Sequence, residues 1–224
     1  YVRDPAIAIS DVIAASAAVP GLIGPLVIRS RDFDWYRYEG QEIFPASTPA
    51  PRYELWDGGV YDNLGVEPLF KPGGGFREGF DFLIVSDASA RLTFDPRSFR
   101  RMLKPGHRAL RLVDVATEQV RGLRARTIIA EFERCPDAGV YVRIGNTVEE
   151  IYDAVGRVRP AGEWLENDEV AKAGNFGTTL RRLNVEEFHL IARHGFEVAN
   201  ATLATRQGAR FSYRSAPSHC ARSQ

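Results

Sequence analysis

A short and strongly apolar run, Phe80–Val85, is followed at once by the polar pair Ser86–Asp87. A compact apolar run of this length is typical of a strand covered on both faces, as in a parallel α/β sheet. The segment Ala138–Gly145 has the pattern of another strand. Helical patterns occupy residues 98–132 and 184–205, the second as one helix or as two divided near Gly195. Alternating strands and helices predict an α/β layered domain.

The N-terminal segment Ala6–Val19 is almost entirely apolar or small, and Pro20–Gly21 end it. Asp4 is a predicted N-cap, and Pro5 suits a first helical turn. Because Ala and Ser lie on all sides of this predicted helix, we expect it to be buried. The following segment, residues 31–51, is aromatic, charged and then rich in proline, and we expect it to be irregular.

Composition excludes several classes of function. The chain has 224 residues with 29 basic and 29 acidic side chains, so its net charge of zero gives no indication of a nucleic-acid partner. Cys135 and Cys220 form no disulfide framework, and the four histidines lack metal-ligand spacing, so we expect no metal and no cofactor. No apolar run approaches the roughly 18 residues that span a bilayer. We expect a cytoplasmic or peripheral membrane location.

The segment Arg97–Arg126 carries nine basic residues and two acidic ones, Asp114 and Glu118. A solvated helix face explains such an excess. Attraction to anionic lipid headgroups, worth about 1 kcal/mol per basic residue near a surface, explains it as well. The sequence leaves both interpretations open, and the second predicts contact with a membrane surface.

A carboxylate followed by two glycines, Asp57–Gly58–Gly59, ends a segment with strand character, and Asp62–Asn63 follow closely. Asp-Gly is a common turn sequence. A carboxylate at the end of a strand also lies where α/β folds place their chemistry, and glycine allows positive φ or the close approach of another chain. Asp57 is therefore either a turn residue or a catalytic group.

Three motifs in order resemble the second half of the patatin-like phospholipases. They are "ASAAVPG" at Ala15–Gly21, "DGGVYDN" at Asp57–Asn63, and a C-terminal helix that carries His194–Gly195–Phe196. The resemblance covers about Val2–Leu203. It implies a three-layer α/β/α domain with a mainly parallel central sheet, spanning residues 1–205 and followed by a disordered basic tail at 206–224.

The resemblance also implies a serine acyl hydrolase that acts on lipid esters. In this family a serine in a Gly-x-Ser-x-Gly elbow attacks the ester, and the Asp of the Asp-Gly-Gly motif activates it without a histidine. Asp57 is then the base, and Gly58 and Gly59 shape the site. Asn63 is expected to fix the following loop, and Ser16 to pack behind the site as a small polar residue.

The chain contains no Gly-x-Ser-x-Gly, and its closest imitation, Ala14–Ala18, lacks the glycines. The Gly-rich oxyanion loop is also missing, because Gly73–Gly75 come after Asp57, whereas the family places this loop before the serine. Both elements precede the Ala-Ser-Ala-Ala motif in the family. We therefore expect a C-terminal portion of a longer hydrolase, inactive alone, whose sheet is incomplete on its N-terminal side and exposes an unpaired edge and apolar surface.

Two other interpretations remain. The first is a non-catalytic lipid-binding or scaffold protein derived from the same fold. The second sets the resemblance aside and takes the chain as a generic α/β domain in which Asp57–Gly58 is only a turn.

Overall fold

A computed structural model describes residues 2, 5–20, 23–39, 42–48, 50–77, 79–89, 105–177, 179 and 181–212, with the backbone alone for 105–110. The chain divides into two compact units. The first unit consists of Tyr1–Gly65 and Asp95–Arg121, and the second of Val66–Phe94 and Gly122–Gln224. The long helix α3, Pro105–Arg134, begins in the first unit and ends in the second.

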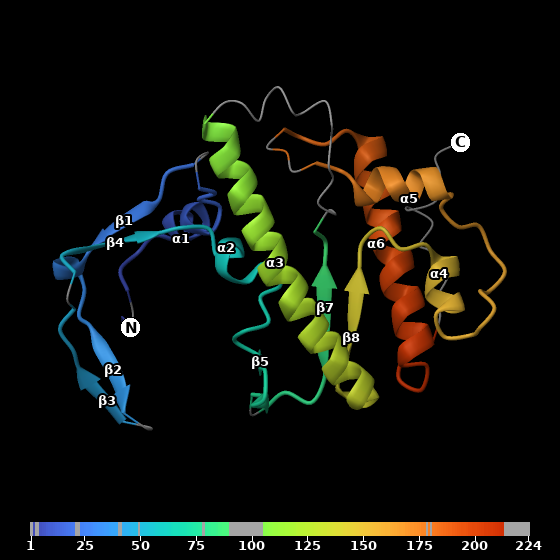
Figure 1. The fold of residues 1–224 in the computed structure, drawn as a ribbon, viewed down its shortest axis with the longest axis horizontal. Helices are drawn as coiled ribbons and strands as arrows, with labels where there is room; N and C mark the ends of the chain where they lie inside the picture. The colour runs from blue at the N-terminus through green and yellow to red at the C-terminus, as the bar shows by residue number, and fades with distance from the viewer. Residues whose placement is uncertain are drawn as a thin grey trace. The chain divides into compact units, whose positions relative to one another are not determined.

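The first unit contains two antiparallel strand pairs and two short helices besides its part of α3. Strand β1 pairs with β4, and β2 pairs with β3, while α1 lies beside β1 (Figure 1). The elements are α1 (Ile9–Ser16), β1 (Leu26–Arg29), η1 (Ser30–Asp32), β2 (Tyr36–Glu39), β3 (Glu42–Pro45), β4 (Arg52–Leu55) and α2 (Gly59–Asp62).

Helix α1 is exposed, and the prediction that it is buried was wrong. Its only fully buried residue is Ala15, whereas Ile9, Val12 and Ile13 are 78%, 54% and 64% exposed. The helix begins at Ile9, and the predicted cap Asp4 lies outside the described residues. Composition indicated that this helix has no polar face, but burial also requires a partner, and no described residue covers this side of it.

The segment expected to be irregular forms the β2–β3 hairpin. Tyr36 pairs with Pro45 and Glu39 with Glu42, so two residues connect the strands. Aromatic and β-branched side chains, which favour strands, occupy half of the positions in the two strands. The proline that argued against a strand lies at its last residue, where a missing N–H is tolerated.

The second unit combines one parallel strand pair with a small hairpin and a group of helices. Strands β7 and β8 run parallel, from Leu83 paired with Gly139 to Asp87 paired with Arg143, and β5 pairs with β6. The elements that follow the first unit along the chain are β5 (Phe70–Lys71), β6 (Gly75–Phe76), β7 (Leu83–Asp87), η3 (Pro136–Ala138), β8 (Gly139–Arg143), α4 (Val148–Asp153), α5 (Asn167–Gly174) and α6 (Val185–Arg206).

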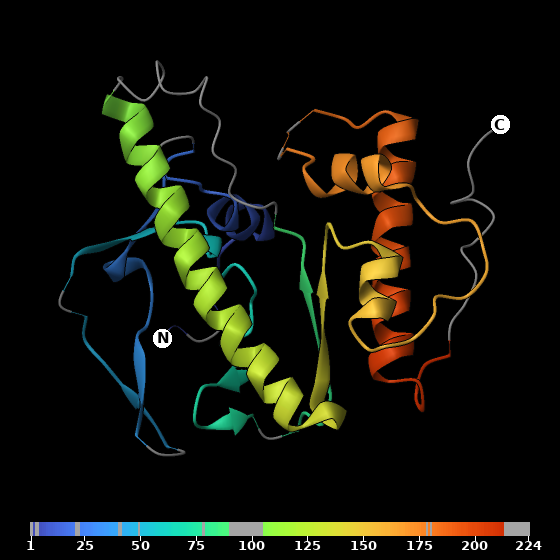
Figure 2. The same ribbon diagram turned by 45° about the vertical axis from the view of Figure 1, so that its right-hand side comes forward.

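Two helices cover the two faces of β8. A Cβ added to Gly139 would come within 2.5 Å of the Phe132 ring, so the C-terminal part of α3 packs directly on the strand backbone. Val140 and Val142 point to the opposite face and are buried in a core to which α4 and α6 contribute. Figure 2 shows these two helices beside β8. Helix α6 does not cover β7 equally, since Ile84 on that strand remains 49% exposed.

The mixed α/β class is confirmed, but the described residues contain no extended parallel central sheet. Among the described residues there are four sheets of two strands each, of which only β7–β8 is parallel. The strand predicted at Phe80–Val85 is observed at Leu83–Asp87, with alternate residues buried rather than both faces covered. Ile84 is 49% exposed, and within the described residues neither β7 nor β8 pairs with a further strand. The expected incompleteness of the sheet stays a prediction.

Helix α6 is a single helix through Gly195. Asn184 caps it by accepting a hydrogen bond from the Glu187 amide at 2.8 Å, while the Glu187 carboxylate accepts one from the Asn184 amide at 3.0 Å. The helix packs against β8, α4 and α5. Val198 and Ala201 of this helix belong to the hydrophobic core of the unit. The other buried residues of this core are Val140, Val142, Val148, Ile151, Tyr152 and Trp164.

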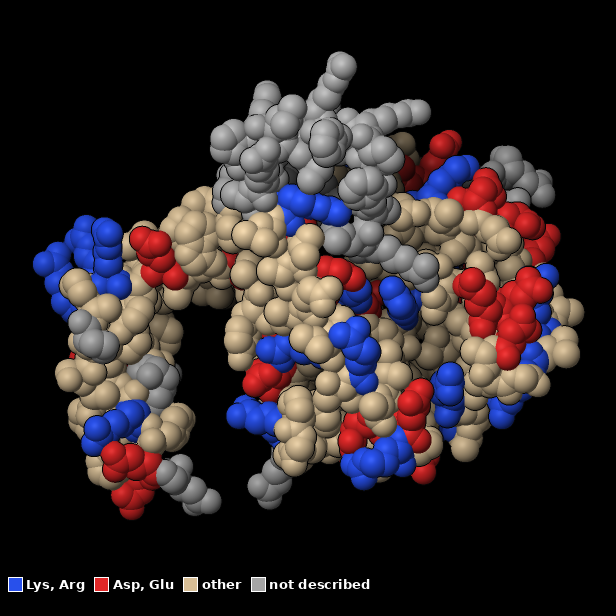
Figure 3. Space-filling model, in the orientation of Figure 1, with Lys and Arg blue, Asp and Glu red and all other residues tan. Residues whose placement is uncertain are grey.

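Acidic side chains occupy the first turns of α4 and α5, and Asp and Glu gather over these helices in Figure 3. Each helix begins with a capping box, in which Glu150 and Glu169 accept hydrogen bonds from the N-cap amides. Negative charge at these ends opposes the helix dipole and stabilises the helix start.

The buried side of α6 carries an ion pair. Arg193 and Glu197 are 5% and 2% exposed, and Nε of Arg193 lies 2.8 Å from Oε1 of Glu197. The pair also binds the loop before α5, because Glu197 accepts a hydrogen bond from the Leu165 amide at 3.2 Å and Arg193 donates to the Glu163 carbonyl at 3.0 Å. The ion pair and the bond to the Leu165 amide are buried, and the bond to the Glu163 carbonyl is partly buried.

The disorder expected from residue 206 does not hold for the first seven residues of the tail. Arg206 ends α6, and Gln207 is buried, with its side-chain amide donating to the Pro136 carbonyl. The centre of the Phe82 ring lies 5.9 Å from that of the Phe211 ring and 5.0 Å from the Arg210 guanidinium carbon. Residues 213–224 lie outside the described part.

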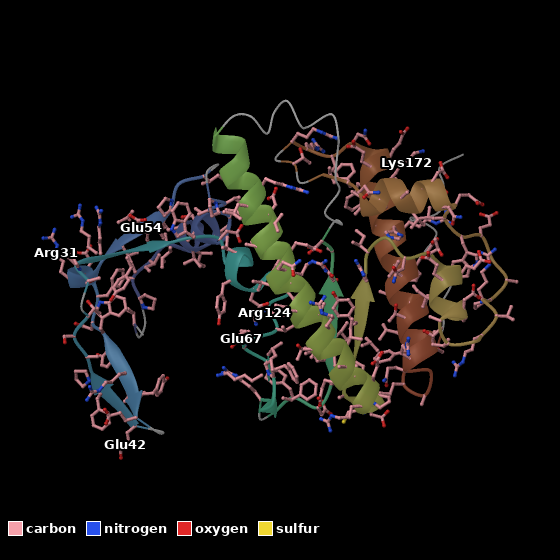
Figure 4. All side chains as sticks on the ribbon, viewed as in Figure 1. Arg31, Glu42, Glu54, Glu67, Arg124 and Lys172 are labelled. Atoms are coloured by element: carbon pink, nitrogen blue, oxygen red, sulfur yellow. The ribbon has the colours of Figure 1, made fainter. Side chains whose placement is uncertain are left out.

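We predict that Glu197→Ala lowers the free energy of unfolding by about 3–5 kcal/mol, because it leaves the Arg193 charge buried without its partner. The control is Lys172→Ala, which breaks an exposed ion pair with Asp168 at 3.2 Å (Figure 4) and should cost less than about 1 kcal/mol. Urea unfolding measures both variants. Equal losses for the two would contradict the structural role of the buried pair.

Candidate functional site

Asp57 follows β4 in the first unit, in a position fixed by its own backbone. Its amide donates a hydrogen bond to the Ala18 carbonyl at 3.1 Å, just beyond the end of α1. The structure therefore brings together the two motifs that resemble the hydrolase family, Ala15–Gly21 and Asp57–Asn63. Ala15 and Ala18 are 7% and 1% exposed, so the small residues of the first motif pack closely at this junction.

The Asp57 side chain has a turn role. Its Oδ1 accepts a hydrogen bond from the Gly59 amide at 2.7 Å, and its carbonyl accepts one from the Val60 amide at 3.1 Å. These two bonds form an Asx turn that starts α2. The side chain is half-buried, and within the described residues no hydrogen-bond donor reaches Oδ2. One carboxylate oxygen thus fixes the turn, and the other stays available.

The two glycines differ in what surrounds them. A Cβ on Gly59 would lie 2.9 Å from Oδ1 of Asn63 and 3.0 Å from Oδ1 of Asp57, so the turn itself requires glycine there. A Cβ on Gly58 would meet no described atom within 4 Å. Gly58 has φ −62° and ψ −23°, which any residue adopts, so neither strain nor crowding within the described chain requires glycine at this position.

Ser16 and Asn63 lie on either side of this junction in the sequence. Asn63 packs against Gly59 as the following loop begins, although its predicted role in fixing the loop stays a prediction. Ser16 is the last residue of α1 and is exposed, so the expectation that it packs behind the site was wrong. Ala15 and Ala18, which are three positions apart, are buried on the same side of this segment, and Ser16 lies on the exposed side.

We predict that Gly59→Ala lowers the free energy of unfolding by about 1–3 kcal/mol, because the new methyl group displaces the side chains of Asp57 and Asn63. Gly58→Ala should leave stability unchanged or raise it slightly, since its methyl group enters open space. Thermal and urea unfolding of the two matched variants test the difference. The reverse order of stability would refute this account of the turn.

Part of the basic segment Arg97–Arg126 is neutralised inside the chain. Arg121 pairs with Glu118, and Arg124 pairs with Glu67 at 2.5 Å (Figure 4). Residues 97–104 lie outside the described part of the chain. The predicted membrane contact therefore rests on the remaining basic residues of the segment and stays a prediction.

His194, from the family-like His194–Gly195–Phe196, is a buried structural residue of the second unit. It is 1% exposed, and its Nε2 accepts a hydrogen bond from the Gly145 amide at 2.9 Å. Because an accepting Nε2 carries no proton, the neutral ring is the form that makes this bond. Burial lowers the pKa of His194 below its ordinary value of 6.5.

We predict that stability falls on mild acidification. Above pH 6.5 His194 is neutral in both states; below this pH the unfolded chain gains a proton that the folded chain resists, so the free energy of unfolding decreases as the pH falls. His194→Gln keeps a hydrogen-bond acceptor without this titration. Urea unfolding between pH 5 and 7.5 should give a steeper decrease for the natural chain than for the variant; parallel curves would contradict the prediction.

A second buried polar pair lies at the carboxyl end of β7. Asp87 is 1% exposed, its Oδ1 accepts a hydrogen bond from the Ser89 amide at 3.1 Å, and its Oδ2 accepts one from the Tyr141 hydroxyl. The bond from the Ser89 amide closes a turn at the end of the strand. The bond to Tyr141, which ties β7 to β8, had no signal in the sequence.

In the described residues, no group of three or more His, Cys, Asp or Glu side chains has a geometry suited to a metal ion. No described helix is both long and apolar enough to cross a membrane. Comparisons of the chain with protein-family models, with curated proteins and with solved structures gave no match.

Proposed function

We propose that this chain supplies the general base of a Ser/Asp acyl hydrolase that acts on lipid acyl esters, such as phospholipids or lysophospholipids. Asp57 is the base, and the nucleophilic serine comes from polypeptide outside these 224 residues, because the chain has no Gly-x-Ser-x-Gly. The motifs quoted above suggest this function by their resemblance to the patatin-like family. No cofactor is needed, and a lipid surface is the expected partner.

One observation supports the proposal above the others. The Asp57 carboxylate is oriented by the Gly59 amide through Oδ1, while Oδ2 receives no hydrogen bond from the described residues. A Cβ on the neighbouring Gly58 would meet no atom within 4 Å other than those of its own chain neighbours. A base needs this combination of a fixed side chain and a free oxygen within hydrogen-bond reach of the incoming hydroxyl, about 2.6–3.2 Å.

The proposed chemistry runs in two halves. The serine oxygen attacks the ester carbonyl carbon as its proton passes to Oδ2 of Asp57, and the departing alkoxide takes up that proton as the acyl-oxygen bond breaks. Water then attacks the acyl-serine, gives its proton to Asp57, and releases the fatty acid as the serine oxygen is protonated again. The Gly59 amide holds the carboxylate in one orientation through both halves.

We predict that Asp57→Asn lowers the kcat of the full-length protein that contains this chain by about 10²–10⁴-fold, because the side-chain amide cannot accept the proton. The amide oxygen can still accept the bond from Gly59, so stability should change little. Glu54→Gln, an exposed change on β4, is the control and should retain activity. Full activity of Asp57→Asn, or a large loss of stability with unaltered kcat, would leave Asp57 as a turn residue only.

A fluorophosphonate probe tests where the serine lies. The probe should label the full-length protein that the complete reading frame encodes, and it should fail to label residues 1–224 alone. Labelling of these residues alone would overturn the assignment of the serine to another segment.

A second candidate function is non-catalytic lipid binding or scaffolding. The apolar stripe Ile9, Val12 and Ile13 on α1 supports it, since these residues share one side of a helix and exposed apolar patches mark interaction sites. Sedimentation with phosphatidylcholine vesicles distinguishes the candidates. The scaffold would be favoured if the full-length protein shows no serine that reacts with the probe, binds the vesicles, and loses this binding when Ile13→Ser is introduced.

A further inference from the structure

A largely apolar cavity of 340 Å³ lies in the second unit, at the edge of β8 that no described strand covers. Figures 1 and 2 both show the C-terminal ends of α3 and α6 at the same end of this unit as the start of β8. These three elements and the turn between α3 and β8 form the cavity, which is lined by Ile129, Phe132, Glu133, Pro136, Gly139, Val140, Tyr141, Thr202 and Arg206.

The inner wall is both apolar and fixed. Phe132 and Val140 are 9% and 2% exposed, and the Phe132 ring lies directly against Gly139. The Gln207 side-chain amide donates a hydrogen bond to the Pro136 carbonyl, which holds the end of α6 to the turn before β8. Packed core residues therefore form one wall of the cavity.

The lining carries one basic and one acidic side chain. Arg206 ends α6 and Glu133 lies near the end of α3, and both are exposed. Among the described residues, no carboxylate lies within the 4.0 Å that defines an ion pair with Arg206. Its guanidinium can therefore receive an anion, while Glu133 disfavours a ligand with more than a small negative charge.

We infer that this cavity binds a medium-chain fatty acid of about eight carbons or a similar single-chain monocarboxylate. The alkyl chain would lie on Phe132 and Val140, and the carboxylate would accept hydrogen bonds from Arg206, which binds carboxylates with two donors. The volume lies at the small end of the range for ligand sites, about 300–1,000 Å³, and so suits one chain of this length. The inference does not depend on the proposed dyad, because it concerns binding in a separate unit.

Calorimetric titration of the chain with sodium octanoate tests the inference. Octanoate should bind, octylammonium should not, and octanol should bind at least about tenfold more weakly than octanoate, because it lacks the charge. Arg206→Ala should weaken octanoate binding about tenfold, and Glu133→Gln should strengthen it. Preference for octylammonium, or the same affinity in natural chain and Arg206→Ala, would overturn the assignment.

Ile129→Trp tests the location of the ligand, because the larger ring would fill the cavity. The matched control is Leu123→Trp, on the same helix but 58% exposed and outside the lining. The first variant should lose octanoate binding and the second should keep it, with both melting near the temperature of the natural chain. Binding that survives Ile129→Trp in a folded variant would place the octanoate elsewhere and refute the inference.

Discussion

Burial of one side of α6 is the constraint on which the second unit depends. The buried positions recur with helical spacing from Arg193 to Thr205, and this side contacts β8, α4 and α5. Most of these positions are polar, so burial alone does not stabilise the helix. The Arg193–Glu197 pair and the His194 bond to Gly145 satisfy the polar groups within the protein, which makes the packing specific as well as stable. Strand β8 is held by this helix on one face and by the C-terminal part of α3 on the other.

In the first unit, a single main-chain bond has the corresponding role. The Asp57 amide and the Ala18 carbonyl connect two segments that are separated by two strand pairs along the chain. Because this bond uses backbone atoms, it fixes the position of Asp57 without occupying its carboxylate. The side chain can then serve the α2 turn through one oxygen and, in the proposed function, an incoming hydroxyl through the other.

Sequence reasoning was reliable where local chemistry decides the outcome. The strand β8 and the helix α6 lie close to the predicted ranges, because apolar runs and the Asn184–Glu187 capping box are local signals. Predictions from the sequence failed where the outcome depends on contacts between distant segments of the chain. The composition of helix α1 suggested burial, although no described residue covers Ile9 or Ile13. Arg193 and Glu197 have the four-residue spacing of a surface ion pair, and no local signal reveals that both are inside the protein. The position of Asp57 in a turn was predictable, but its bond to Ala18 was not.

Under the proposed function, the Asp57 carboxylate serves both the turn and the reaction, and this double use has an evolutionary consequence. A descendant that has lost its nucleophile still needs Asp57 and Gly59 to fold the start of α2, so selection for folding alone preserves both. Gly58 has no such protection, since a methyl group there touches nothing in the described chain. Among divergent copies of this sequence, active hydrolases should therefore retain glycine at position 58, and degenerate ones should drift at that position first.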